Sequence, residues 1–232
     1  MRLRDVEDVS KLTPAMQQYA NLKKNNESSL LFFRMGDFYE LFFDDAIITA
    51  KELNITLTKR GKVLNESIPM CGIPFHAANN YVPKLVKKGF EIAICEQTNS
   101  SEEMASKGIK GPLAREVTRI ITPGTLIEEN HLESEQHNFL GAIFINKSNF
   151  SISWLDVSTG CFVSNIFEYG TEQELNYKIE NILNKISVTE LLVSDNENRS
   201  LEYLSLKIKK ISHTIFGYDK NLERLNNYFN DK

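Results

Sequence analysis

Short apolar runs separated by turn-forming residues most constrain how this chain can fold. The run Leu-Leu-Phe-Phe at 30–33 is too short for a buried helix and predicts an interior strand. Gly36-Asp37 interrupts it, and a second aromatic run follows at 38–43. No apolar run in the sequence approaches the ~18–20 residues needed to cross a bilayer. We therefore expect a globular protein with a core built from short elements.

Helix signals alternate with strand signals up to residue 122. Thr13-Pro14 predicts a helix start, since a hydroxyl can cap the first turn and proline lacks an N–H that would go unpaired there. Asp44 or Asp45 is expected to cap the next helix. Further strands are predicted at 55–58, 90–94 and 117–121, and a further helix at 80–89. This pattern predicts a compact α/β unit at 13–122, preceded by a flexible tail at 1–12.

A second α/β unit is predicted after a break at Pro123-Gly124. The segment 123–130 is expected to be a linker, and 131–232 a second domain. Thr171 and Glu174 have the spacing of a capping box, which predicts a helix through residue 186. An antiparallel meander is predicted from runs at 139–145, 150–156 and 161–166, later strands at 191–193 and 208–216, and a final helix at 221–229.

The charge is distributed unevenly. The whole chain has a net charge of −4, which argues mildly against nucleic-acid binding. Residues 1–127 nevertheless contain 17 Lys and Arg against 15 Asp and Glu, a balance of +2, so the remainder carries −6. The segment 59–88 holds six basic residues against Glu66 alone. Any contact with a polyanion is therefore expected in the first half, although solvated surface lysines would give the same pattern.

The cysteines and the N-terminus indicate a cytoplasmic protein. Cys71, Cys95 and Cys161 are scattered, odd in number and without a CxxC pair, which disfavours a disulfide framework or a zinc site. The first five residues are charged where a secretory signal needs an apolar stretch. We expect a cytoplasmic protein that is not attached to a membrane.

Common enzyme signatures are missing from the sequence. Around Gly61-Lys62, Thr56 and Val63 stand where a phosphate-binding P-loop needs glycine and Ser or Thr. No GxSxG nucleophile elbow occurs. The histidines are isolated and are expected to be structural: His76, His131, His137 and His213.

One string, RMGDFYELF at 34–42, resembles the Phe-X-Glu signature of the mismatch-recognition domains of the MutS family. The likeness weakens in the second half, which resembles the family's connector domain. The resemblance implies an α/β fold with a mixed-sheet mismatch-recognition domain at 13–122 and a ribonuclease H-like connector at 131–232. The likeness to the mismatch-recognition domains continues after residue 42 through further strings: LTKRG at 57–61, IPMCGIPFHA at 68–77, residues 81–89, ICEQ at 94–97, KGP at 110–112 and TPGT at 122–125.

The resemblance also implies roles for two residues. Phe38 is the wedge that stacks on a mispaired or unpaired base from the minor groove of kinked DNA, and Glu40 hydrogen-bonds that base. An inserted ring must offset the cost of unstacking, which is smaller where a base is already poorly stacked. A carboxylate can accept from a base N–H that mispairing leaves free. Lys59, Arg60 and Lys62 are expected in a turn between strands, where they hold the DNA backbone.

A nuclease is the main enzymatic alternative. Asp37, Glu40, Asp44 and Asp45 are acids that could gather a metal ion. Enzymes of the ribonuclease H fold hold magnesium with acids on central strands, but the run at 139–145 has none, and Asp156 on the next run has no evident partner. No metal site or catalytic residue is therefore expected.

The resemblance implies partners and cofactors beyond this chain. Family members continue to an ATPase that also forms the dimer, and the connector here is expected to be incomplete at its C-terminus. ATP and Mg are expected only with that absent domain. Expected partners are duplex DNA with mismatches or small insertion loops, the remaining MutS polypeptide and its dimer mate, and a MutL-like protein through the connector. The alternative is a protein-interaction module with little DNA binding of its own.

Overall fold

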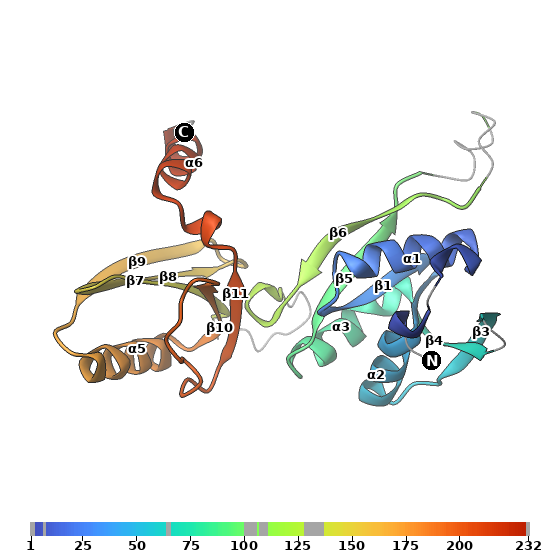
Figure 1. Cartoon of the computed structure of the whole chain (residues 1–232), viewed down its shortest axis with the longest axis horizontal. Helices are drawn as coiled ribbons and strands as arrows, with labels where there is room; N and C mark the ends of the chain where they lie inside the picture. The colour runs from blue at the N-terminus through green and yellow to red at the C-terminus, as the bar shows by residue number, and fades with distance from the viewer. Residues whose placement is uncertain are drawn as a thin grey trace. The chain divides into compact units, whose positions relative to one another are not determined.

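The computed structural model describes residues 3–6, 8–63, 66–99, 106, 111–127 and 137–230. The chain divides into two compact units, Met1–Thr122 and Pro123–Lys232. Each unit contains one mixed β-sheet with helices (Figure 1), which confirms the predicted α/β class. Within the described part of the chain, no helix is both long and apolar enough to cross a membrane.

The first unit is built on a six-stranded sheet in the order β3-β4-β2-β1-β5-β6. Only the β1–β5 pair is parallel, and the other neighbours are antiparallel. The strands are β1 (Ser29–Met35), β2 (Phe38–Phe42), β3 (Thr58–Val63), β4 (Glu66–Pro74), β5 (Glu91–Gln97) and β6 (Arg115–Ile121). The helices are α1 (Pro14–Lys24), α2 (Phe43–Leu53) and α3 (Ala78–Val86).

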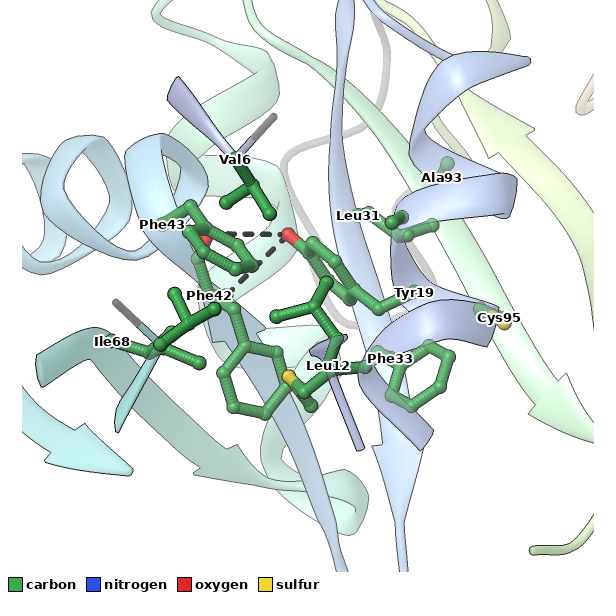
Figure 2. Packing of buried hydrophobic residues seen from close by; sticks show 13 residues of the cluster. Val6, Leu12, Tyr19, Leu31, Phe33, Phe42, Phe43, Ile68, Ala93 and Cys95 are labelled. Atoms are coloured by element: carbon green, nitrogen blue, oxygen red, sulfur yellow. Dashed lines mark hydrogen bonds between the residues drawn. The ribbon is translucent and has the colours of Figure 1, made fainter. Parts of the chain in front are cut away.

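Tyr19 of α1 lies at the centre of one core of this unit (Figure 2). Its ring is fully buried and meets those of Phe33 and Phe42 edge to face, with centroids 5.5 and 5.2 Å away. Its hydroxyl donates to Asp45 at 2.9 Å. The helix predicted from Thr13-Pro14 is confirmed, with Pro14 as its first residue, but the predicted cap is wrong because the Thr13 hydroxyl makes no cap hydrogen bond.

Asp45 has a different role from the predicted helix cap. Helix α2 begins one residue before Asp44, after Phe42, so neither aspartate occupies the cap position. Asp45 instead turns inward, where it accepts from the Leu31 N–H at 3.0 Å and pairs with Lys23 at 2.9 Å. Burial raises the pKa of Asp45, against the opposing effect of Lys23. The cap prediction was wrong because interior donors were available to this carboxylate.

The N-terminal segment packs against the same core. Two short 3-10 turns, Leu3–Asp5 and Val9–Lys11, bring Val6 and Leu12 into the cluster around Tyr19 (Figure 2). Both side chains are less than a tenth exposed. The expectation of a flexible tail is therefore wrong for the described residues of 1–12, because irregular turns can bury apolar side chains without a periodic pattern.

Strand β2 lies between two residues with left-handed backbone. Gly36, in the turn before it, has φ +59°, and Phe43, directly after it, has φ +54°. Glycine adopts this conformation freely, whereas a bulky side chain is strained there. The Phe43 ring is 1% exposed, so its burial offsets the backbone strain. Both ends of β2 are thereby fixed by sharp turns.

The second unit has a five-stranded sheet in the order β11-β10-β7-β8-β9. Three antiparallel strands are followed by two that run parallel to the first, an arrangement compatible with the expected ribonuclease H-like connector. The strands are β7 (Phe139–Ile145), β8 (Asn149–Asp156), β9 (Cys161–Glu168), β10 (Val188–Ser194) and β11 (Lys207–Ile211). The helices are α5 (Glu172–Ile186) and α6 (Tyr218–Asn230).

Local signals in this unit were mostly right. Thr171 caps α5 by accepting from the Glu174 N–H at 3.2 Å. The strand predicted at 208–216 ends earlier, at Ile211, and the 3-10 turn His213–Phe216 follows. Asp195 causes this ending in part, because its carboxylate accepts from the His213 N–H at 2.8 Å.

The expected linker at 123–130 is wrong for its first residues. Pro123–Thr125 forms a 3-10 turn against β7 and β10 of the second unit. The Gly124 N–H donates to Glu190 at 2.9 Å, and a Cβ atom at Gly124 would lie 2.8 Å from Leu140 Cδ1. The rest of the predicted linker from residue 128, with His131, lies outside the described residues.

Candidate nucleic-acid interface

Phe38 lies at the start of β2, directly after the Gly36-Asp37 turn. Its side chain is 47% exposed, whereas the next residue, Tyr39, is 6% exposed. Successive strand residues point to opposite faces, so Phe38 and Glu40 share one face of the sheet and Tyr39 the other. Phe38 is thus an aromatic side chain presented to solvent at the start of a strand whose other apolar residues are buried.

The turn that carries Phe38 is held from several sides. Arg34 Nε donates to the Gly36 carbonyl at 2.5 Å, and the Phe75 N–H donates to the Asp37 carbonyl at 2.9 Å. The Arg34 guanidinium carbon also lies 3.5 Å from the centroid of the Phe75 ring, a cation–π contact. These contacts fix the backbone on both sides of Phe38.

Arg115 of β6 contacts the residues of β1 that lead into the same turn. Its Nε donates to the Arg34 carbonyl at 2.7 Å, and its Nη2 lies 3.3 Å from the Met35 sulfur. Its guanidinium also lies over the Phe33 ring, 4.7 Å from the centroid. Phe33 and Met35 are the register partners of Glu40 and Phe38, so Arg115 contacts the residues beside both predicted site residues.

The opposite face of the hairpin carries a separate polar cluster. The Tyr39 hydroxyl donates to Glu96, which lies 3.9 Å from Arg34. Burial and the hydrogen bond to Glu96 raise the pKa of Tyr39 to about 12, so this hydroxyl stays protonated at neutral pH. This cluster stabilises the hairpin on the side away from Phe38.

Glu40 is engaged by a basic residue of the same predicted site. Arg60 Nη1 donates to Glu40 Oε1 at 2.6 Å and also contacts Oε2. The Glu40 side chain is 12% exposed, and that of Arg60 is 47% exposed. The structure therefore joins the residue expected to read the base to one expected to hold the DNA backbone.

The basic residues lie on a strand and not in a turn. Lys59, Arg60 and Lys62 belong to β3, which lies at the edge of the described sheet and pairs there with β4. The register shifts between Lys59 and Lys62, and Gly61 there has φ +72°, so the strand bulges. All three basic side chains are exposed. The prediction of a turn was wrong because the glycine makes a bulge instead of ending the strand.

The acids considered for a nuclease site do not converge. Glu40 pairs with Arg60 and Asp45 with Lys23, while Asp37 is exposed on the hairpin. Among the residues that the structure describes, no group of three or more His, Cys, Asp or Glu side chains could hold a metal ion.

Asp156 of the second unit has a structural partner set. It accepts from the Ser158 backbone and hydroxyl, at 2.9 and 2.6 Å, and lies 2.8 Å from His137 Nδ1. Burial opposes its ionisation, but these hydrogen bonds hold the pKa of Asp156 well below its usual range. Asp156 thus closes the turn between β8 and β9.

Sequence reasoning missed Arg115 and Gly72. Gly72 opposes Glu40 across the β2–β4 pair, and a Cβ atom there would lie 3.6 Å from Glu40 Cγ. Gly72 stands within the string IPMCGIPFHA, so the resemblance marked its neighbourhood without giving it a role. Arg115 followed no motif, and its contacts span about 80 positions of sequence, which no local pattern reveals.

Two family models match the chain in consecutive segments. MutS domain I matches residues 13–130, and MutS domain II matches residues 138–232. The ATPase domain is not among the matched parts.

Several curated relatives are similar over most of the chain. The DNA mismatch repair protein MutS of Ehrlichia ruminantium (strain Welgevonden) is 44% identical over 219 residues, which are 94% of this chain and 26% of that protein. That of Ehrlichia chaffeensis is 48% identical over 186 residues, 80% of this chain and 22% of that protein. That of Wolbachia pipientis wMel is 41% identical over 225 residues, 94% of this chain and 26% of that protein.

This chain thus spans about a quarter of the length of these relatives. The two domain models account for most of its residues in the order expected from the sequence. The chain belongs to the MutS family of DNA mismatch repair proteins, of which it carries domains I and II.

Proposed function

We propose that this chain binds duplex DNA carrying a mismatch or an unpaired base, with Phe38 as the wedge and Glu40 as the residue that contacts the displaced base. The observation that carries the proposal is the 47% exposure of Phe38 on a braced hairpin, two residues before Glu40 on the same sheet face. A wedge must not yield when it enters the base stack, and the Arg34, Arg115 and Phe75 contacts meet that requirement.

Selectivity follows from deformability and not from sequence reading. Inserting an apolar side chain between base steps costs a few kcal/mol in unstacking, and a kinked duplex then contacts more protein. A mismatched base is already poorly stacked, so the same kink costs less there. Glu40 adds discrimination, because a paired base has no free N–H for its carboxylate.

Lys59 and Lys62 supply affinity without selectivity in this proposal. Both are exposed on the edge strand β3, and among the described residues neither has an ion-pair partner. Ammonium groups in this setting neutralise phosphates and release counterions, which strengthens binding to any duplex. Reading the lesion and holding the backbone are thus divided between β2 and β3.

The proposed unit is a binding unit and not a catalyst. ATP binding, magnesium and dimerisation are assigned to the parts of family members that lie beyond domains I and II. A MutL-like protein and the remaining polypeptide are proposed partners of the second unit. Its helix α6 favours this, since Tyr218, Leu222, Leu225 and Phe229 follow helical spacing and are each 43–77% exposed.

The test is fluorescence anisotropy at low salt, with a duplex containing one unpaired T or one G·T pair and its matched counterpart. Phe38→Ala is expected to weaken binding to the mismatched duplex by about 1–3 kcal/mol, roughly 5- to 150-fold, because a stacked ring is lost. The control is Phe162→Ala, which removes a ring of similar exposure, 52%, from the second unit. Equal affinities for both duplexes, unchanged by Phe38→Ala, would sink the proposal.

A further inference from the structure

The ion pair between Glu40 and Arg60 crosses a strand. Glu40 lies on β2 and Arg60 on β3, and the sheet order places β4 between them. Neighbouring strands lie about 4.8 Å apart, so the two backbones are separated by roughly 10 Å or more. Only a long side chain such as that of arginine can bridge this separation.

Gly72 leaves room for this bridge. It is the β4 residue that opposes Glu40, it is exposed, and a Cβ atom there would stand 3.6 Å from Glu40 Cγ on the same face. Its φ lies outside the left-handed region, so the backbone at this position does not require glycine. A Cβ atom there would also lie 3.3 Å from the Tyr39 carbonyl oxygen, so position 72 contributes the missing side chain beside the backbone and side chain of this part of β2.

Burial distinguishes the two partners. The Glu40 side chain is 12% exposed, so its charge is largely shielded from water and needs a compensating partner. Arg60 supplies that partner through a single nitrogen, Nη1, which contacts both carboxylate oxygens. A carboxylate offers about four acceptor positions, so some remain for a further donor such as a base N–H.

Arg60 differs in this respect from the lysines on its strand. Lys59 and Lys62 are exposed and have no ion-pair partner within the described ranges, whereas the charge of Arg60 is already matched by Glu40. A cation that is neutralised by the protein displaces little from the counterion layer of DNA. Of the three basic residues expected to hold the DNA backbone, Arg60 is thus paired within the protein, whereas Lys59 and Lys62 remain available to phosphates.

We propose that Arg60 is a positioning residue for Glu40 and not a grip on the DNA backbone, an inference that rests on the proposed function. The guanidinium fixes a side chain that otherwise has several rotamers, so Glu40 meets a mispaired base already ordered. It also offsets the repulsion between the carboxylate and nearby phosphates. Arg60 thus sets mismatch preference, while Lys59 and Lys62 set general affinity.

The first test uses the free chain and NMR of the arginine side chains. In the wild type, the two Nη resonances of Arg60 are expected to separate, because the ion pair slows rotation of the guanidinium. In Glu40→Gln they are expected to merge. Arg119, exposed on β6 and without an ion-pair partner among the described residues, is the internal control. Merged Arg60 resonances in the wild type overturn the inference and leave the proposed function untouched.

The second test measures the ratio of affinities for mismatched and matched duplexes over a salt series. Arg60→Gln is expected to lower this ratio by about three- to thirtyfold, since Glu40 must then be ordered during binding. Arg60→Lys, which keeps the charge, is expected to recover only part of it. Lys59→Gln and Lys62→Gln are matched controls on the same strand. Each is expected to keep the ratio and to reduce the slope of log K against log salt by about 0.9.

The outcomes separate the inference from the proposed function. A ratio that falls in Arg60→Gln and partly returns in Arg60→Lys supports both. An unchanged ratio with a slope reduced as in the lysine variants makes Arg60 a backbone grip and overturns the inference alone. A higher ratio also overturns it, because Arg60 would then withhold Glu40 from the base. A wild-type chain without mismatch preference overturns the proposed function and the inference together.

Discussion

The two units expose their large apolar side chains in different ways. In the first unit the exposed aromatic rings are those of Phe38 and Phe75, which flank one turn and are held there by backbone and cation–π contacts, while the exposed aliphatic side chains are scattered over other elements. In the second unit the exposed apolar side chains lie along surfaces, chiefly those of α6 and of one sheet face with Phe144, Phe162 and Ile166. Groups of exposed apolar side chains are typical of protein interfaces, whereas a ring held at a braced turn suits insertion. The support around an exposed aromatic residue is thus more informative than its exposure.

Helices α5 and α6 of the second unit also differ in whether their apolar residues are buried. Helix α5 buries Leu175, Ile179 and Leu183 against the sheet. Helix α6 has apolar residues at similar spacing, but none of its described residues is buried. The same amphipathic pattern therefore stabilises the unit in one helix and remains available for contacts in the other.

The largest effect is expected from a truncation in α5. Leu183→Ala removes a side chain that is 1% exposed and is expected to lower the free energy of unfolding of the second unit by about 2–5 kcal/mol. Urea unfolding followed by the fluorescence of Trp154, the single tryptophan, measures it. A loss below about 1 kcal/mol would mean that α5 packs no better than α6.

Acid is expected to act on the two units in opposite directions through their buried aspartates. The pKa of Asp156 is lowered, so its ionised form contributes stability at neutral pH that is lost as the pH falls below its ordinary value of 3.8. The pKa of Asp45 is raised, so its ionisation costs stability as the pH rises through that raised value.

Asp156→Asn tests this difference. It is expected to lower the stability of the second unit at pH 7 by about 1–3 kcal/mol and to flatten its acid limb between pH 5 and 2, compared through Trp154 fluorescence. Asp45→Asn is the matched control, and it should leave that limb unchanged. An acid limb equally steep in Asp156→Asn would assign the loss to other groups.

Truncation in α6 is expected to have the smallest effect. Leu225 is 47% exposed, so Leu225→Ala is expected to change the free energy of unfolding by less than about 0.5 kcal/mol. The same urea titration measures this change beside that of Leu183→Ala. A cost above 1.5 kcal/mol would show that α6 is packed in solution and would remove the contrast between the helices.

Much of the fold could be predicted because its signals are local. Pro14 begins α1 because it has no N–H to leave unpaired, and Thr171 caps α5 through the Glu174 N–H, so each signal acts within one turn of helix. The burial of Val6 and Leu12 could not be predicted, because it depends on irregular turns that leave no periodic pattern in the sequence. The sequence does not distinguish the bulge at Gly61 from a turn, because glycine with positive φ serves both structures.

The candidate site could be predicted only in part. Phe38 and Glu40 came from a resemblance, and their shared face follows from the period of a strand. The bond between Glu40 and Arg60 depends on the order of the strands and on the empty position at Gly72. No spacing along the sequence contains that information, so Arg60 could be grouped only with its basic neighbours.

The sharp turns at Gly36 and Phe43 make the length of β2 a fixed quantity. Because the strand cannot slide at either end, deleting one residue between them would move Tyr39 or Leu41 to the face of Phe38 and Glu40. A substitution within this segment changes one side chain, whereas a change in its length moves every side chain after it to the opposite face of the sheet. Among related sequences, insertions and deletions should therefore be rarer between positions 36 and 43 than substitutions are.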